Sequence, residues 1–234
     1  MLSKNFSIEA VCESSILIQF ADEISVVLPP FINRVAELIY AHHTDSIMNL
    51  TPSYTTLLVD YLPYRIPEHA MLESLAQIVH QVDSFQALPS DNTVTLPVYY
   101  GSDVAPDLSS ILRKKSMDLH TLIAKHTTPD YTICAIGFAP GFAFLSGLDS
   151  DLITPRLATP RLKVIAGSVG IADNQTAVYP STTPGGWNII GNCPSKLFDP
   201  ESEQLSPFRI GDKVRFESIT KQRYLELGGE LWAI

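Results

Sequence analysis

The chain has 234 residues, of which 45% are hydrophobic and 18% are charged. This length allows one large domain or two small ones, and the composition is that of a globular protein rather than a disordered or fibrous one. The 16 basic and 25 acidic residues give a net charge of −9. General binding to nucleic acid or to an anionic membrane is therefore not expected, because both need a basic surface.

Several further classes are disfavoured by the motifs that the sequence lacks. The three cysteines are far apart and form no C-x-x-C motif, so we expect reduced, mostly buried thiols in a cytoplasmic protein rather than disulfides. No signal peptide is recognisable, and no segment approaches the roughly 18 consecutive apolar residues of a transmembrane helix. No H-E-x-x-H motif is present, and no metal site is predicted. The phosphate-binding motifs G-x-x-x-x-G-K-[ST] and G-x-G-x-x-G are also missing.

Residues 1–88 are expected to form a two-layer α+β domain. Apolar residues fall on one face of a helix that follows Pro30, and a second such stripe begins at Met71. Short apolar runs, one of them the β-branched and aromatic TTLLVDY, predict strands. The expected order is strands at 6–11 and 15–20, a helix after Pro30, strands at 47–50 and 55–61, and a helix from Pro67.

Residues 83–92 show no hydrophobic periodicity and are interpreted as a linker. From Asp130 onward, short apolar runs alternate with glycine and proline. Closely spaced short strands of this kind predict a mainly-β domain, at 89–234, built as a closed or nearly closed barrel. The elements expected before the barrel strands are a strand at 93–99 and helices near 106–115 and 117–126.

The most informative segment is GFAPGFAFLSGLD, residues 137–149. A regular strand does not favour so much glycine and proline, so we favour a loop that faces a ligand over a hydrophobic loop that closes the barrel end. A weaker signal is Ala-Gly-Ser-Val-Gly around Ser168, a loose match to the nucleophile elbow of serine hydrolases. No helix is expected after it, so a tight turn between strands is the preferred interpretation.

Two arginines and a tryptophan follow this segment. Arg156 and Arg161 each come directly after a proline, and guanidinium groups bind carboxylates and phosphates in a bidentate way. Trp187 follows a Gly-Gly turn. Two interpretations stay open: a pair of surface charges and a buried tryptophan, or side chains that line a ligand site.

Seven ordered motifs, between about residues 126 and 216, resemble those of one family. After the run from His126 to Tyr131 come GF-x-PGF-x-FL-x-GL, PR-x-x-x-PR, AGSVGIA, QT-x-x-YP, TPGGW-x-IIG and LFDP. This pattern resembles the 5-oxoprolinase B-subunit family, which includes the inhibitor of the sporulation histidine kinase and is also called allophanate hydrolase subunit 1. The resemblance implies an N-terminal α+β domain followed by a cyclophilin-like β-barrel.

The resemblance also implies an activity and partners. It implies a multi-subunit hydrolase that opens 5-oxo-L-proline to L-glutamate with ATP and Mg, and no covalently bound cofactor. The implied partners are a subunit-C-like barrel protein and a subunit-A-like protein that binds 5-oxoproline, and this chain is expected to be inactive without them. Two alternatives are an inhibitor of a sensor histidine kinase and one half of a urea amidolyase-type carboxyltransferase.

The matched motifs imply roles for particular residues. An unactivated lactam opens slowly, and phosphoryl transfer to its carbonyl oxygen depends on positioning and charge stabilisation. Arg156 and Arg161 are expected to bind a carboxylate or phosphoryl oxygen, and His126 to act as general acid or base. Backbone N–H groups are expected from Gly141, Gly167 and Gly185. The implied substrate-binding residues are Phe138, Pro140, Gly141, Phe142, Phe144, Gly167, Ser168, Gln175, Tyr179, Pro184, Gly185, Gly186 and Trp187.

Overall fold

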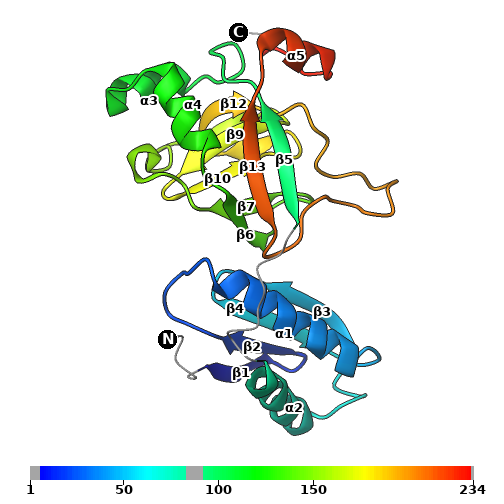
Figure 1. Ribbon diagram of the computed structural model, residues 1–234. Coiled ribbons are helices and arrows are strands. Elements are labelled where there is room, and N and C mark those ends of the chain that lie inside the picture. The colour runs from blue at the N-terminus through cyan, green and yellow to red at the C-terminus, as the bar shows by residue number, and fades with distance from the viewer. Residues whose placement is uncertain (1–5, 83–91, 233–234) are drawn as a thin grey trace. The chain divides into compact units, whose positions relative to one another are not determined.

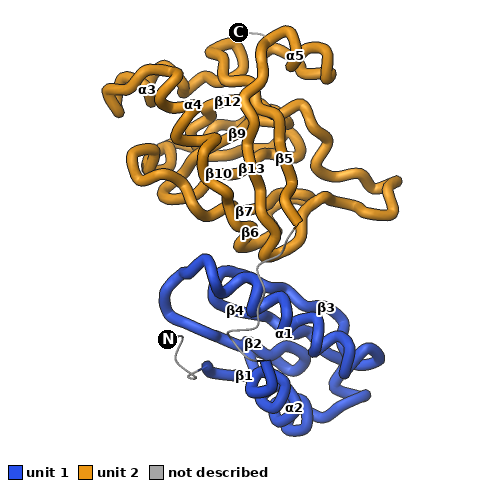
Figure 2. Tube along the Cα trace, viewed as in Figure 1, with its two compact units in different colours: residues 1–90 blue, residues 91–234 orange. Residues whose placement is uncertain are grey.

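The computed structural model describes residues 6–82 and 92–232. The chain divides into two compact units, residues 1–90 (unit 1) and 91–234 (unit 2), which Figure 2 colours separately. The predicted domain boundary between residues 88 and 89 lies outside the described residues. In the part of the chain that is described, no helix has both the length and the apolar character needed to cross a membrane.

Unit 1 has the predicted order of strands and helices (Figure 1). Its four strands form one antiparallel sheet in the order β1-β2-β4-β3, and α1 and α2 contact each other and this sheet. The elements are β1 (Ser7–Cys12), β2 (Ser15–Gln19), α1 (Leu28–His42), β3 (Ile47–Pro52), β4 (Thr56–Tyr61) and α2 (Glu68–Gln81).

Buried and half-buried side chains alternate along the central strands β2 and β4, and the buried ones form the core of unit 1. Ile16 and Ile18 on β2 are buried, whereas the residues between them are half-buried, and Leu57 and Val59 repeat the pattern on β4. A period of two places these side chains on one face of the sheet. They pack against the apolar stripes of both helices, whose buried members are Leu28, Phe31, Ile32, Val35, Ala36 and Ile39 on α1 and Met71, Leu75, Ile78 and Val79 on α2.

Unit 2 is a nearly closed barrel with short helices on its outside. Seven strands follow the order β12-β9-β10-β7-β6-β13-β5, and β8 pairs with β11 in a separate ribbon. The elements are β5 (Thr93–Val98), α3 (Leu108–Lys115), α4 (Leu119–Thr127), β6 (Tyr131–Ile136), β7 (Ala143–Ser146), the 3-10 turn η1 (Ser150–Leu152), β8 (Arg161–Val164), β9 (Ser168–Ala172), β10 (Gln175–Val178), β11 (Thr183–Gly185), β12 (Asn188–Asn192), β13 (Lys213–Ser218) and α5 (Lys221–Glu226).

A single bridge joins the two ends of this sheet. Tyr99, which directly follows β5, exchanges two backbone hydrogen bonds of 2.9 Å with Asn192 at the end of β12. On its other side, β5 pairs in parallel with β13, which Figure 1 shows as neighbouring green and red-orange arrows. The prediction of a nearly closed barrel is therefore confirmed.

The segment around Ser168 is a turn between strands, as predicted, and not a nucleophile elbow. Ser168 begins β9, and β9 leads into β10 without an intervening helix. Its side chain is buried, whereas an elbow would expose it at a strand-to-helix turn. Cys134 and Cys193 are buried as expected, but Cys12 is exposed, because it ends the edge strand β1.

Replacing Gly167 with alanine is expected to destabilise unit 2 by about 2–4 kcal/mol. Gly167 has φ +80°, and an added Cβ would overlap the Cys193 carbonyl oxygen and the Asn192 side chain. Gly137→Ala is the matched control, since a Cβ at Gly137 meets nothing within 4 Å. Urea unfolding followed by tryptophan fluorescence measures both variants, and equal losses for the two would contradict the packing described here.

Candidate functional site

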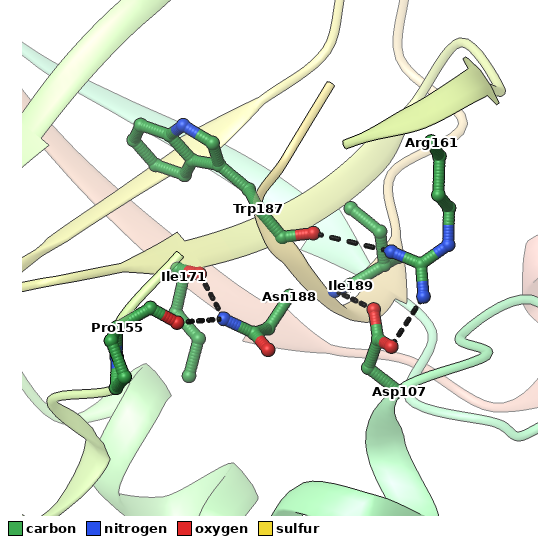
Figure 3. A network of polar contacts seen from close by, with 7 residues as sticks. All are labelled: Asp107, Pro155, Arg161, Ile171, Trp187, Asn188 and Ile189. Carbon is green, nitrogen blue, oxygen red and sulfur yellow. Dashed lines mark hydrogen bonds and ion pairs between the residues drawn. The ribbon is translucent and has the colours of Figure 1, made fainter. Parts of the chain in front are cut away.

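A buried carboxylate connects α3 to the barrel (Figure 3). Asp107, immediately before α3, accepts a hydrogen bond of 2.7 Å from the Ile189 backbone N–H and pairs through its other oxygen with Arg161. The side chains of Asp107 and Arg161 are 12% and 26% exposed. Arg161 also donates to the Trp187 carbonyl oxygen at 3.5 Å. We call this group of Asp107, Arg161, Trp187 and Ile189 the clamp, because it ties β8 and the start of β12 to α3.

Asn188 fixes the neighbouring loop. Its side chain is buried, and its amide donates to the carbonyl oxygens of Pro155, at 2.9 Å, and Ile171, at 3.3 Å (Figure 3). Both bonds run to backbone atoms, so they hold the main chain and not a particular side chain. Because Pro155 directly precedes Arg156, Asn188 sets where the Arg156 backbone lies relative to β12.

Five of the predicted substrate-binding residues form one aromatic cluster. Phe142 lies at its centre, with ring-centroid distances of 4.8 Å to Phe144, 5.2 Å to Phe138, 5.3 Å to Tyr179 and 5.9 Å to Trp187. Phe142, Tyr179 and Trp187 are buried, whereas Phe138 is 65% exposed. Residues 137–142 therefore bury the ring of Phe142 and leave the ring of Phe138 exposed, and the ligand-facing role of this loop stays a prediction.

Arg156 lies at the edge of the aromatic cluster. Its guanidinium carbon is 5.9 Å from the centre of the Trp187 ring, a distance at which a cation and an aromatic face attract each other. Its Nε lies 3.7 Å from Asp173, and the two side chains are 58% and 61% exposed. Burial raises the pKa of Tyr179, and the nearby Arg156 and Arg161 oppose that rise. Both predicted arginines and the aromatic cluster are therefore close together.

The side chain of His126, on α4, lies in the core of unit 2 and not at its surface. The side chain is fully buried, stacks on Phe216 at 4.4 Å, and makes hydrogen bonds of 2.7 Å to the Tyr100 hydroxyl and 2.9 Å to the Thr176 hydroxyl. Since Thr176 donates to the Gly170 carbonyl oxygen, it accepts from His126 Nε2–H, and the Tyr100 hydroxyl donates to Nδ1. Burial lowers the pKa of His126 to about 3. The predicted acid–base role does not fit this geometry, because both ring nitrogens are engaged by the core.

The three glycines predicted to offer backbone N–H groups lie where other parts of the chain pack closely against them. Gly167 donates its N–H to the Tyr179 carbonyl oxygen. A Cβ on Gly141, which has φ +81°, would lie 2.7 Å from the Leu197 carbonyl oxygen, and a Cβ on Gly185 would overlap the Tyr179 hydroxyl. The Gly167 N–H is therefore engaged within the chain, whereas the roles of the Gly141 and Gly185 N–H groups stay predictions. Of the other predicted residues, Ser168 is buried, Gln175 and Gly186 are half-buried, and Pro140 and Pro184 are exposed.

Two residues that hold this arrangement together, Asp107 and Asn188, are not among the predicted site residues. Asp107 belongs to the predicted helix start at Pro106-Asp107, and Asn188 lies inside TPGGW-x-IIG, where the glycines and the tryptophan are the more distinctive residues. The signal for Asp107 is a carboxylate beside a helix start, and the signal for Asn188 is an amide within a buried strand. Both indicate a structural role because buried polar groups need hydrogen-bond partners.

Comparison with known proteins places the chain in a family. Residues 6–208 match the family model described as carboxyltransferase domain, subdomain C and D. The 5-oxoprolinase B subunit of Bacillus subtilis (strain 168) is 32% identical over 237 aligned residues, which cover 95% of this chain and 97% of that protein. The chain belongs to the 5-oxoprolinase B-subunit family.

Two solved structures have a fold similar to that of this 5-oxoprolinase family member. TTHA0988 is 30% identical with a TM-score of 0.77, and the match covers 88% of this chain but only 40% of TTHA0988. The Kluyveromyces lactis urea carboxylase matches with a TM-score of 0.71 over 95% of this chain and 22% of that chain, at 16% identity. The second likeness shows a shared fold and carries nothing about the reaction.

Proposed function

We propose that this chain is the B subunit of an ATP-dependent 5-oxoprolinase, a hydrolase that opens 5-oxo-L-proline to L-glutamate together with a subunit-C-like and a subunit-A-like partner. The observation that carries this proposal is similarity over nearly the whole length of both chains to the Bacillus subtilis 5-oxoprolinase B subunit. In this proposal the enzyme acts in the cytoplasm, and the chain is inactive by itself because the reaction is divided among subunits.

The site supports a binding and positioning role for this subunit. Arg156 offers an exposed cation, the aromatic cluster offers an apolar surface, and the clamp holds Trp187, which contacts both, on the barrel. Phosphoryl transfer to a lactam oxygen depends on such positioning and on charge stabilisation. In our proposal the complex uses ATP with Mg for this step, and Arg156 is the group of this chain that meets an anionic reactant.

The test is ATP-dependent release of glutamate from 5-oxo-L-proline by the complex co-expressed from this chain and its genomic neighbours, with and without this chain. We expect glutamate only when the chain is present. A full-length chain carrying Arg156→Ala, purified in the same complex, is expected to assemble but to lose most of the activity. Glutamate release that is indifferent to the chain would overturn the proposal.

One alternative has an observation of its own. The matching family model is named for a carboxyltransferase domain, which favours transfer of a carboxyl group as the competing function. Incorporation of labelled bicarbonate into a product by the same co-expressed complex, without glutamate release, would establish it. A histidine kinase recovered with the chain in place of the subunit-C-like and subunit-A-like proteins would favour the inhibitor alternative.

A further inference from the structure

We infer that only one of the two arginines, Arg156, binds a ligand, and that it recognises the single carboxylate of a small cyclic acid whose ring lies against the aromatic cluster. Arg161, in contrast, positions the site through the clamp. This inference rests on the proposed function in one respect: it makes 5-oxo-L-proline, or a ring compound like it, a direct ligand of this subunit and not of the subunit-A-like partner alone.

The positive charge of Arg161 is already paired with a carboxylate of the protein, that of Asp107. Its guanidinium pairs with Asp107 and donates to the Trp187 carbonyl oxygen, and the pair is largely buried. A ligand carboxylate would have to compete with Asp107, whose second oxygen is held by the Ile189 N–H. Breaking a buried ion pair leaves an uncompensated charge, so this arginine is better suited to hold the backbone than to exchange partners.

Arg156, unlike Arg161, is exposed and only loosely paired. More than half of its side chain is exposed, and its ion pair with Asp173 is loose, with 3.7 Å between Nε and the carboxylate oxygen. Exposed pairs of this kind contribute little and exchange partners readily. The Nη atoms of a guanidinium form a fork that matches a carboxylate in bidentate geometry, and the contact with Trp187 holds that fork beside the aromatic cluster.

Phe138 supplies the second, independent observation. It has φ +72°, which is rare for a bulky residue, and the ring remains 65% exposed. Backbone strain of this kind is concentrated at ligand-binding positions. The ring is edge-on to Phe142 at 5.2 Å and to Tyr179 at 6.4 Å, so the cluster fixes its orientation.

The charges favour one carboxylate over a triphosphate. Arg156 and Arg161 are matched by Asp173 and Asp107, so a ligand that displaces Asp173 gains one free cation. The N–H groups of Gly167 and Gly137 donate to carbonyl oxygens of the chain, whereas phosphate sites use such groups as donors. A flat, partly apolar ring with one negative charge complements an aromatic cluster that has a single exposed arginine at its edge.

The experiment uses the fluorescence of the full-length chain carrying Trp232→Phe, in which Trp187 is the only tryptophan. The probes are 5-oxo-L-proline, its neutral amide and ATP. We expect saturable quenching with 5-oxo-L-proline. Arg156→Ala and the neutral amide should each weaken binding by about 10- to 100-fold, because each removes one member of a charge-assisted pair.

Variants at neighbouring positions separate the roles of the residues. Arg156→Lys should bind with intermediate affinity, Phe138→Ala should bind more weakly than the parent, and Arg215→Ala should be unchanged, since Arg215 pairs with Asp130 elsewhere on the barrel. Circular dichroism confirms that each variant is folded. Arg156-dependent quenching by ATP and not by 5-oxo-L-proline would overturn the inference in favour of a phosphate site.

The failure of this inference differs from the failure of the proposed function. If no probe changes the Trp187 emission while glutamate release still requires the chain, the ligand assignment is wrong and the subunit assignment stands. If 5-oxo-L-proline binds through Arg156 but the complex releases glutamate without the chain, the ligand assignment stands and the proposed function is wrong.

Discussion

Replacing Asp107 with asparagine is expected to lower the free energy of unfolding of unit 2 by about 2–4 kcal/mol. The change leaves the largely buried Arg161 without its counter-charge and weakens the acceptor for the Ile189 N–H. Urea unfolding at pH 7 measures the loss. The activity of the complex should also fall, by up to about 100-fold, because small displacements of a binding surface have large kinetic effects.

The control for this prediction is Asp130→Asn. Asp130 also pairs with an arginine, Arg215, but both side chains are about half exposed, so the expected loss is below about 1 kcal/mol. Arg161→Met with and without Asp107→Asn completes a double-mutant cycle, in which a coupling of about 1–3 kcal/mol is expected. Equal losses for Asp107→Asn and Asp130→Asn would contradict the clamp.

Lowering the pH from 7 to 5 is expected to reduce the stability of unit 2 by about 2 kcal/mol through His126 alone. Burial lowers the pKa of His126 from its ordinary 6.5 to about 3, so in this window the unfolded chain binds a proton that the folded chain does not. Stability therefore falls as the pH falls below about 6.5, and the fall continues toward pH 3. Unfolding free energies from urea titrations at the two pH values measure it.

The matched variant is His126→Gln, which should be less stable at pH 7 but should lose most of this pH dependence. Burial and the neighbouring His42 also lower the pKa of His43, which adds a slope of the same sign in unit 1. Tryptophan fluorescence separates the two, because both tryptophans belong to unit 2. An unchanged pH dependence in His126→Gln would show that another group is responsible.

Hydrophobic periodicity is sufficient to predict most elements of both units. In unit 1 it predicts all four strands and both helices, because each element buries one face against the next. In unit 2 the predicted helices at 106–115 and 117–126 correspond to α3, Leu108–Lys115, and α4, Leu119–Thr127. These features are local, so they can be read from neighbouring residues.

The arrangement of the site is only partly predictable. The motifs identify the aromatic residues and both arginines, but the pairing of Arg161 with Asp107 joins positions that are far apart in the sequence. That pairing decides which arginine is available to a ligand. The burial of His126 cannot be read from its neighbours for the same reason: its partners Tyr100, Thr176 and Phe216 come from three separate segments.

The parallel pairing of β5 with β13 has a consequence for how the protein is made. The first strand of the barrel cannot acquire this neighbour until the ribosome has synthesised residues 213–218, which follow the other strands of the barrel. Contacts between such distant segments form slowly, whereas unit 1 has all of its strands and helices by residue 81. During translation unit 1 can therefore fold first, while the apolar strands of the nascent barrel remain exposed. We expect chaperones to bind the barrel more than unit 1 for this reason.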